Sequence, residues 1–364
     1  MKVGILGGGQ LARMIALAGY PLDVEFIVLD PNDDAGAVGL AEHLHGDYND
    51  KSLLAKLADK ADVVTYEFEN VPAEVAAFLA EHTQVYPAPN ALAVSQDRLH
   101  EKEFFHQLDI PTAHYAAVSS LEDLQQAMEY IHYPAILKSR RMGYDGKGQV
   151  VLKSVEQLAE AWKSVDGVDC VVEGFVNFQR EVSIIAARRP NGEIVFYPLS
   201  ENIHEKGILR VAECCIDDPL QKQAEEYATK LLEALDYVGV IALELFDVNG
   251  TFIANEFAPR VHNSGHWTIE GAETSQFENH LRAILDLPLG STQARGHTAM
   301  VNFIGGLPET KSILDISHAH HHLYAKSPRK GRKVAHATVR SDNKVQYTES
   351  LQHLIELAKS TDDS

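Results

Sequence analysis

The sequence has few cysteines and no long apolar run. Only three of its 364 residues are cysteines, Cys170, Cys214 and Cys215, too few and too poorly spaced for a disulfide framework or a paired-cysteine metal site. They are expected to be reduced thiols of a cytoplasmic protein. No stretch approaches the roughly 18 apolar residues of a spanning helix, and Gly7 to Gly9 with Arg13 interrupt any signal-peptide core.

Basic residues are also scarce, with 32 Lys and Arg against 52 Asp and Glu and a formal net charge of −20. Such a field repels polyanions, which argues against a nucleic acid or an anionic membrane as a partner. The charge is uneven, because residues 291–364 hold ten basic and seven acidic residues. At roughly 100–200 residues per domain, the length suggests two or three domains.

Apolar runs alternate with helical patterns over the first quarter of the chain. Strands are expected at 2–6, 25–30 and 63–68, and helices from 10, over 53–60 and over 73–82. This alternation predicts a parallel sheet with helices on its faces, a Rossmann-like α/β domain over residues 1–95.

The middle of the chain changes character after a helix that ends before Pro111. Asn191-Gly192 and Asn249-Gly250 each lie between alternating strands, a strong hairpin signal, and a long amphipathic helix starts near Pro219. These features predict an α+β domain with antiparallel sheet over residues 96–290. Residues 291–364 are expected to form a small β-rich third domain.

Gly7, Gly8 and Gly9 follow the first strand and open a helix, and Asp30 closes the second strand. This spacing fits the dinucleotide fingerprint, in which glycines let a pyrophosphate approach a helix N-terminus. The alternative is that the turn needs glycine for its geometry and that any bound anion is a different ligand.

A second glycine-rich segment, from Lys138 to Gly148, lies between two apolar strands and carries several Lys and Arg residues. Backbone N–H groups and cations in such a loop can fold over a polyphosphate. It lacks the spacing of a Walker A loop, and the alternative is a flexible surface hairpin. The cations favour phosphate binding.

Two glutamates flank the hairpin at Asn249-Gly250. Glu244 lies in the apolar run IALELF, and Glu256 follows Asn255 on the returning strand. The hairpin brings these oxygens together, and hard oxygen ligands suit Mg²⁺ on a nucleotide's phosphates. Solvated glutamates are the commoner case, but an unpaired charge inside an apolar run is costly.

Three further segments stand out. The polar block from Arg260 to His266 is expected to line a substrate pocket and to have no role in a core. The segment 324–333 holds five cations, a candidate phosphate or carboxylate site in so acidic a chain. The run His318 to His322 is expected to be a histidine-rich strand leading into Tyr324, in preference to a metal tract.

The order KSRRMGYDGKGQ, VVEGFVNFQREVS, PLSENIH, LELF, NEFAPRVHNSGH and YAKSPRKGRK resembles the N5-carboxyaminoimidazole ribonucleotide synthetase (PurK) family of ATP-grasp enzymes. The resemblance covers essentially the whole chain. It implies an ATP-grasp fold with a Rossmann-like pre-ATP-grasp domain, a homodimer, and ATP-dependent carboxylation of 5-aminoimidazole ribonucleotide by bicarbonate through carboxyphosphate. It also implies ATP and Mg²⁺ as cofactors.

The resemblance also implies roles for individual residues. Around bicarbonate and the reacting amine it places Tyr144, Asp145, Arg260, His262, Asn263 and Ser264. Around the nucleotide it places Arg98, Lys138, Gly143, Tyr144, Asp145, Gly146, Lys147, Gly148, Gln149, Glu173, Gly174, Phe175, Val176, Glu181, His204, Asn255 and Glu256. At the ribonucleotide it places Gly8, Gly9, Gln10, Leu11, Glu67, Lys326, Arg332 and Lys333, and at Mg²⁺ Glu244 and Glu256.

The loop 143–149 is expected to close over the reaction and exclude water, because carboxyphosphate hydrolyses readily. The chain departs from the family's pattern at Val261, Ala325 and Val334-Ala335, changes that are expected to affect loop geometry more than the chemistry. The alternatives are another ATP-grasp carbon–nitrogen ligase of purine synthesis, a NAD-dependent dehydrogenase, and a nucleotide-binding regulator without activity.

Overall fold

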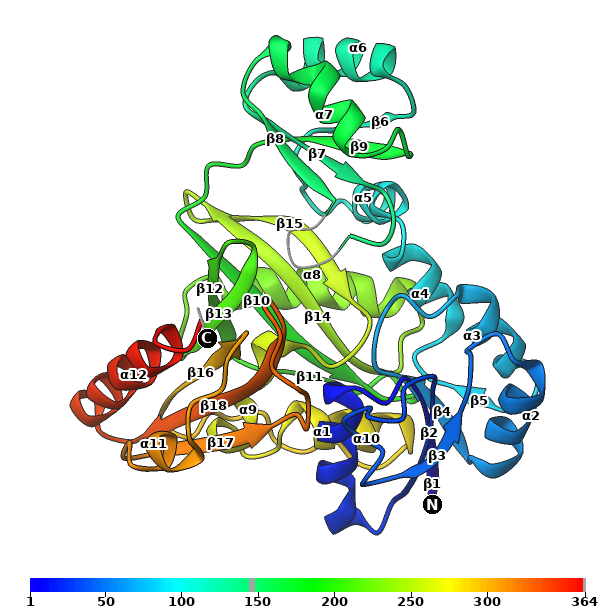
Figure 1. Ribbon diagram of the computed structural model, residues 1–364, viewed down its shortest axis with the longest axis vertical. Coiled ribbons are helices and arrows are strands. Elements are labelled where there is room, and N and C mark those ends of the chain that lie inside the picture. The colour runs from blue at the N-terminus through cyan, green and yellow to red at the C-terminus, as the bar shows by residue number, and fades with distance from the viewer. Residues whose placement is uncertain (144–147, 363–364) are drawn as a thin grey trace.

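The structure is a computed structural model that describes residues 1–143 and 148–362. Three β-sheets lie at the centres of lobes that meet in the middle of the molecule (Figure 1). No described helix is long and apolar enough to cross a membrane.

The amino-terminal lobe is a five-stranded sheet in the order β3-β2-β1-β4-β5, and its pairings are parallel. Its strands are β1 (Lys2–Leu6), β2 (Glu25–Asp30), β3 (Glu42–His45), β4 (Val63–Tyr66) and β5 (Gln84–Val85). Its helices are α1 (Gln10–Gly19), α2 (Lys51–Lys60) and α3 (Ala73–Ala80), with a 3-10 turn at Tyr20–Leu22. The predicted parallel α/β arrangement is confirmed.

Helices α4 (Pro89–Ser95) and α5 (Arg98–Gln107) lead into a four-stranded sheet in the order β6-β9-β7-β8. Asp97 caps α5 by accepting a hydrogen bond from the Leu99 amide at 3.1 Å. The upper lobe of Figure 1 consists of β6 (Tyr115–Val118), α6 (Leu121–Ile131), β7 (Ala135–Ser139), β8 (Gln149–Leu152), the 3-10 turn Val155–Gln157, α7 (Leu158–Ser164) and β9 (Cys170–Gly174).

The largest sheet has nine strands, ordered β15-β14-β10-β12-β13-β16-β18-β17, with β11 paired to β10. Both Asn-Gly turns form the predicted hairpins, β10–β11 and β14–β15. The strands are β10 (Arg180–Arg188), β11 (Ile194–Phe196), β12 (Leu199–Glu205), β13 (Ile208–Cys215), β14 (Gly239–Val248), β15 (Thr251–Ala258), β16 (His297–Ile304), β17 (Ala319–Leu323) and β18 (Lys333–Ser341).

The carboxyl-terminal segment extends this same sheet. Strand β16 pairs antiparallel with β13, with Val211 opposite Val301, so the hydrogen-bonded ladder continues past residue 290. The helices that accompany the sheet are α8 (Gln221–Ala234), the 3-10 turn Asn263–Gly265, α9 (Thr268–Gly271), α10 (Gln276–Ile284), α11 (Thr310–Leu314) and α12 (Lys344–Lys359).

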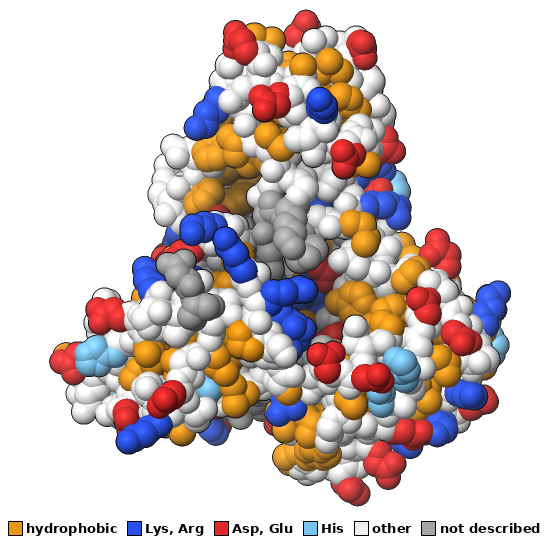
Figure 2. All heavy atoms as spheres, in the orientation of Figure 1, with side chains coloured by type: hydrophobic (Ala, Val, Ile, Leu, Met, Phe, Trp, Pro, Cys, Tyr) orange, Lys and Arg blue, Asp and Glu red, His pale blue; other side chains and the backbone are white. Residues whose placement is uncertain are grey.

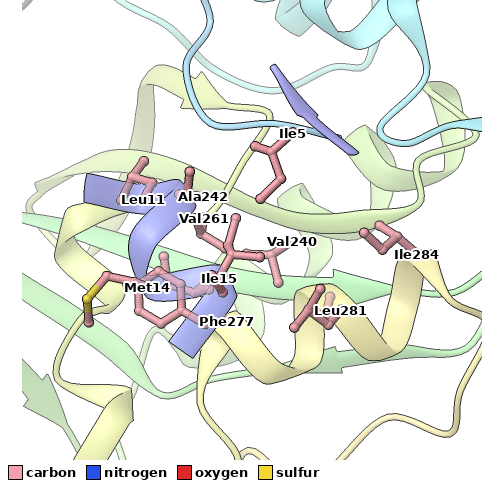
Figure 3. Close-up of a cluster of buried hydrophobic side chains, with 14 of the residues drawn as sticks. Ile5, Leu11, Met14, Ile15, Val240, Ala242, Val261, Phe277, Leu281 and Ile284 are labelled. Atoms are coloured by element: carbon pink, nitrogen blue, oxygen red, sulfur yellow. The ribbon is translucent and has the colours of Figure 1, made fainter. Parts of the chain in front are cut away.

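One apolar core joins the amino-terminal lobe to the large sheet. Met14 and Ile15 of α1 pack in one cluster with Val240 of β14 and Phe277 of α10 (Figure 3). Val261 belongs to the same cluster. Val261 is fully buried, so this departure from the family's pattern supplies core volume. The burial holds the turn before α1 at a fixed place relative to β14.

Ala325 is a different kind of departure, because its backbone has a φ of 55°. In this left-handed region the Cβ crowds the following carbonyl oxygen, which costs roughly 1–2 kcal/mol, whereas glycine adopts it freely. A glycine at this position would fit the conformation better than the alanine does.

We predict that Ala325→Gly increases the free energy of unfolding by about 0.5–1 kcal/mol, because relief of the strain exceeds the extra entropy of the unfolded chain. Urea denaturation measures the change. Ala55→Gly, inside α2, is the matched control and should lower the same quantity by about 1 kcal/mol. Equal destabilisation by both substitutions would contradict the strain argument.

Candidate functional site

The candidate residues lie where the three lobes meet. Lys138 is on β7 and Glu173 on β9 of the upper sheet, whereas Glu181, His204, Glu244 and Glu256 are on strands of the large sheet. Figure 2 shows Lys and Arg side chains gathered near the centre of this face, in contrast to the acidic side chains around its edge. The sequence motifs are thus brought to one region of the fold.

A buried ion cluster connects the upper sheet to the large one. The Glu173 Oε2 atom lies 3.2 Å from the Lys138 Nζ atom and 3.4 Å from the Lys102 Nζ atom, and Lys102 also donates to the Asn255 carbonyl oxygen at 2.6 Å. Burial opposes the ionisation of Glu173, but the two lysines outweigh it and lower its pKa to about 2. Its Oε1 atom has no hydrogen-bond partner among the described residues.

The segment that follows Glu173 crosses from the upper sheet to the large one. The Gly174 and Phe175 amides donate to the carbonyl oxygens of His114 and Pro134 at 2.9 and 3.1 Å, and the Phe175 side chain is exposed. Backbone hydrogen bonds therefore hold Gly174 and Phe175 in place, while the Phe175 ring stays exposed and Val176 continues toward β10. Glu181 and His204 form an ion pair on the facing strands β10 and β12.

The two glutamates of the hairpin face each other as predicted. Glu244 of β14 pairs directly with Glu256 of β15, and a register shift follows Glu244. Burial, followed by the charge of Glu256, raises the pKa of Glu244 to about 7. The described residues contain no group of three or more metal-ligating side chains, so a cation here would take its other oxygens from a ligand or water.

Arg98 and Arg260 flank this hairpin. The Arg98 guanidinium lies 3.7 Å from Glu256 and donates to the Ser139 carbonyl oxygen at 3.4 Å. Arg260 pairs with Glu69 from the loop after β4, a contact between lobes. Glu69 and Lys102 were not predicted as site residues. Each pairs with a residue far away in the sequence, and the local sequence around a charged residue does not indicate such a partner.

The polar block after Glu256 differs from its prediction. Ser264 and His266 are fully buried and Asn263 is 8% exposed. Asn263 exchanges amide hydrogen bonds with Asn302 of β16, at 2.6 and 3.2 Å. The expectation that this block has no role in a core was wrong, because a polar group can be buried when it has hydrogen-bond partners.

His262 remains at the site. Its Nε2 atom lies 3.2 Å from the Glu244 Oε1 atom, and Gln276 clamps its backbone by donating to the carbonyl oxygen at 2.6 Å and accepting from the amide at 2.9 Å. Burial is the main cause that holds the pKa of His262 well below its usual value, with the charge of Arg260 next. The ring is therefore neutral near pH 7.

The glycine turn before α1 is already occupied by the protein's own carboxylates. Gly8 donates its amide to Asp30 at 2.8 Å, and Glu67 accepts from the amides of Gly9 and Ala12. These are the donors that a dinucleotide's pyrophosphate would need. The turn thus has the glycines of the dinucleotide fingerprint, but its amide donors are not free to bind a pyrophosphate.

The basic segment lies over this turn. Lys326 contacts the Gln10 side chain, and Arg13 of α1 donates to the Leu323 carbonyl oxygen at 3.0 Å. Arg332 donates to the Ser327 carbonyl oxygen at 3.3 Å, and Lys333 begins β18. Leu11 is buried in the core of Figure 3, so only its backbone can face a ligand.

The predicted loop residues Tyr144, Asp145, Gly146 and Lys147 lie outside the described residues. Of the same loop, Gly148 has a φ of 71°, and its carbonyl oxygen accepts from the Ser139 amide at 2.8 Å. Gly143 and Gly148 flank the undescribed segment, and Gln149 begins β8. A cavity of about 670 Å³ beside this loop is lined by Asp97, Arg140 and Arg141, and both arginines already form ion pairs with Asp97.

The histidine-rich strand is β17, as predicted. His322 stacks on His336 with ring centroids 4.5 Å apart, and its Nε2 atom lies 3.1 Å from Glu270. The Tyr324 hydroxyl lies 2.8 Å from the His336 Nδ1 atom. These rings pack beneath the basic segment, and the described residues contain no metal-binding cluster there.

Glu101, next to Lys102 on α5, is buried against β15 and accepts a hydrogen bond from the Phe257 amide at 2.7 Å. Burial, followed by the charge of Glu256, raises its pKa from 4.5 to about 8. A carboxyl that is neutral in the fold but ionised in the unfolded chain makes stability fall as pH rises between those two values.

We therefore predict that Glu101→Gln, which keeps the acceptor oxygen, has the stability of the parent protein near pH 4.5 and exceeds it at pH 8, on the order of 1–3 kcal/mol. Urea denaturation at both pH values measures this. Glu103→Gln, at an exposed position of the same helix, is the control and should show no such pH dependence. A Glu101→Gln difference that does not change with pH would count against a neutral Glu101.

Three family models match consecutive parts of the chain. They are a ribonucleotide synthetase preATP-grasp domain over residues 1–96, an ATP-grasp domain over 103–277, and a phosphoribosylaminoimidazole carboxylase C-terminal domain over 298–350. The N5-carboxyaminoimidazole ribonucleotide synthase of Pseudomonas aeruginosa is 52% identical over 340 residues, which cover 93% of this chain and 94% of that protein.

Solved structures agree along the whole chain. N5-carboxyaminoimidazole ribonucleotide synthetase from Thermus thermophilus superposes with a TM-score of 0.94 at 50% identity and 98% coverage of both chains. The Aspergillus clavatus N5-carboxyaminoimidazole synthase, in complex with ADP and 5-aminoimidazole ribonucleotide, has a TM-score of 0.91 at 31% identity, again over 98% of both chains.

Proposed function

The chain belongs to the N5-carboxyaminoimidazole ribonucleotide synthase family of ATP-grasp ligases, and we propose that the residues described above carry out the family's reaction, the ATP-dependent carboxylation of 5-aminoimidazole ribonucleotide. The reaction consumes bicarbonate and ATP and serves purine biosynthesis. The observation that carries the proposal is the pairing of Glu244 with Glu256 beside the buried cluster of Lys102, Glu173 and Lys138.

ATP lies between the upper sheet and the large sheet in this proposal. Adenine occupies the crossing segment after Glu173, whose Oε1 atom has no hydrogen-bond partner within residues 1–143 and 148–362, and the ribose faces the ion pair of Glu181 and His204. The triphosphate extends toward Lys138 and Arg98. The remaining proposed contacts are Gly143, Tyr144, Asp145, Gly146, Lys147, Gly148, Gln149 and Asn255.

Mg²⁺ fits at Glu244 and Glu256, because paired carboxylate oxygens suit a hard cation that is shared with phosphate oxygens. When bound, it neutralises charge as the γ-phosphoryl group moves. Arg98, already 3.7 Å from Glu256, adds a fixed positive charge on the same side.

The chemistry runs in two steps. A bicarbonate oxygen attacks the γ-phosphorus and ADP leaves, which forms carboxyphosphate; the ribonucleotide's amine then attacks the carboxyl carbon and phosphate leaves with loss of a proton. Arg260 and His262 lie beside the carboxylate pair, where they can hold the carboxyl group, and Asn263 and Ser264 support the loop from the core. Tyr144 and Asp145 stay predicted members of this site.

The ribonucleotide's 5′-phosphate is placed at Lys326, Arg332 and Lys333. Lys326 reaches over the turn before α1, where Gly8, Gly9, Gln10, Leu11 and Glu67 form the facing wall. A homodimer rests on the family resemblance, as does the cytoplasm, which the free thiols of Cys170, Cys214 and Cys215 also support.

The test is release of phosphate from ATP by the purified protein. We expect turnover that needs bicarbonate, is stimulated at least tenfold by 5-aminoimidazole ribonucleotide and is abolished by EDTA, since positioning of both substrates and charge neutralisation drive phosphoryl transfer. Product is followed in parallel as acid-labile incorporation of labelled bicarbonate. Phosphate release that is indifferent to the ribonucleotide would refute the assignment.

Lys326→Ala should raise KM for the ribonucleotide roughly tenfold or more, because a charge-assisted contact to its phosphate is lost, and should leave KM for ATP within about twofold. Lys359→Ala removes a distant surface lysine, paired with Glu205, and serves as the control with both constants near those of the parent protein. A parallel rise of both KM values in Lys326→Ala would contradict a role confined to the ribonucleotide.

A further inference from the structure

The beginning of the basic segment lies against the amino-terminal lobe. Strand β17 ends at Leu323 beside α1, and the segment 324–333 follows directly (Figure 1). The loop after β2 reaches the same turn of the chain, because the Ala37 amide donates to the Gly8 carbonyl oxygen at 2.7 Å. Two loops that are far apart in the sequence thus meet next to the turn before α1.

Arg13 of α1 joins these two loops. Its Nε atom donates to the Leu323 carbonyl oxygen at 3.0 Å, and its Nη1 atom donates to the Gly36 carbonyl oxygen, also at 3.0 Å. A guanidinium group only donates and a carbonyl oxygen only accepts, so both bonds run from Arg13 to the loops. Because the guanidinium is a rigid planar fork, it holds the two carbonyl oxygens at a fixed separation.

The contact between the loops leaves no room for a side chain at Gly36. A Cβ atom on Gly36 would lie 2.6 Å from the Tyr324 carbonyl oxygen and 3.4 Å from the Gly9 carbonyl oxygen. The first distance is shorter than the 3.0 Å that real Cβ atoms keep, and the obstacle is backbone, which cannot turn aside as a long side chain can. Glycine therefore permits the close approach of the loop after β2 to the basic segment.

The same contact determines where Lys326 is presented. Tyr324 is fully buried, and its amide donates to the Val334 carbonyl oxygen at 3.2 Å, so the chain leaves β17 along a defined path. Lys326 lies two residues further on and contacts the Gln10 side chain at the start of α1. A shift of Leu323 or Tyr324 away from α1 would move Lys326 as well, because only one residue separates Tyr324 from Lys326.

We propose that Arg13 and Gly36 are positioning residues for the ribonucleotide: together they hold the start of the basic segment against the amino-terminal lobe, so that Lys326 stands where the 5′-phosphate binds. The proposal rests on the proposed function of the basic segment. Arg13 and Gly36 act on the phosphate through Lys326 and make no contact with it themselves. They affect binding of the ribonucleotide and leave the ATP site, between the upper sheet and the large sheet, unchanged.

Arg13→Gln tests the bridge, because the shorter, uncharged side chain cannot reach both carbonyl oxygens. KM for the ribonucleotide should rise about three- to tenfold, with KM for ATP within about twofold of the parent value. Adding Arg13→Gln to Lys326→Ala should change KM for the ribonucleotide by less than about twofold, because both substitutions remove one contact. Losses that add in the double variant would mean that Arg13 itself binds the phosphate, and would overturn the proposal.

Gly36→Ala tests the close approach without removing a charge. Its methyl group would push the loop after β2 and Tyr324 apart, and KM for the ribonucleotide should again rise about threefold or more, with KM for ATP nearly unchanged. Gly39→Ala is the matched control, because a Cβ atom at Gly39 of the same loop would meet no atom within 4 Å. Neither glycine has a φ in the left-handed region, so alanine is not strained at either position. Equal KM values in the two alanine variants would overturn the role of Gly36.

A measurement without substrate separates failure of this proposal from failure of the proposed function. Hydrogen–deuterium exchange, followed by mass spectrometry, reports how often backbone amides lose their hydrogen bonds. Peptides that cover the basic segment should exchange several-fold faster in Arg13→Gln and Gly36→Ala than in the parent protein or Gly39→Ala, whereas peptides of the upper lobe should not change. Unchanged exchange in both variants would overturn the inference even if the carboxylation assay succeeds. If the carboxylation assay fails while exchange rises as expected, the proposed function is refuted and the anchoring of the segment by Arg13 and Gly36 stands.

Discussion

The register of one antiparallel sheet is the constraint on which the rest of the site depends. Neighbouring strands lie roughly 4.8 Å apart, and backbone hydrogen bonds prevent them from sliding. The hairpin β14–β15 carries the carboxylate pair at one edge, and β18 begins with Lys333 near the other. Because the ladder is continuous between them, the separation between the carboxylate pair and the basic segment is a property of the backbone.

The net negative charge of the protein disfavours binding of anionic substrates, whereas fixed cations near the site favour it. A chain of net charge −20 must bind three anionic substrates, so binding has to rely on cations that are held in place. Lys102 and Lys138 are held by the single carboxylate of Glu173, and Arg260 by Glu69. Such pairs orient the cations before substrate arrives, at the cost of desolvating both charges. At the turn before α1 the roles are exchanged, because fixed carboxylates meet backbone N–H donors there. Asp30 and Glu67 accept the hydrogen bonds that a free anion would otherwise accept.

Local patterns predicted much of this arrangement. Alternating strands around Asn249-Gly250 were enough to bring Glu244 and Glu256 into one region, because a two-residue turn determines the register of its hairpin. That register alone would pair Glu244 with Asn255, and the shift beside Glu244, which the sequence did not reveal, places Glu256 opposite it. Contacts between distant parts of the chain were beyond such reasoning. Nothing near Ser183 or Asn302 in sequence indicates that either bonds the loop after β15, and the polar block there was expected outside the core for that reason. Strand β16 joins β13 across many intervening residues, so the continuity of the sheet past residue 290 was equally hidden.

The histidines beneath the basic segment extend this reasoning to the ribonucleotide end. Burial, followed by the charge of His322, lowers the pKa of His266 to about 3 and that of His336 well below its usual value, so both rings are neutral near pH 7. Neutral imidazoles can stack as flat rings and still take part in a hydrogen bond, as His336 does when it stacks on His322 and contacts the Tyr324 hydroxyl. A cluster of charged rings buried in that place would repel the neighbouring lysines and would cost desolvation energy. Their burial therefore supports the strands on either side of Lys326 and leaves the positive charge at the surface, where an anion can reach it.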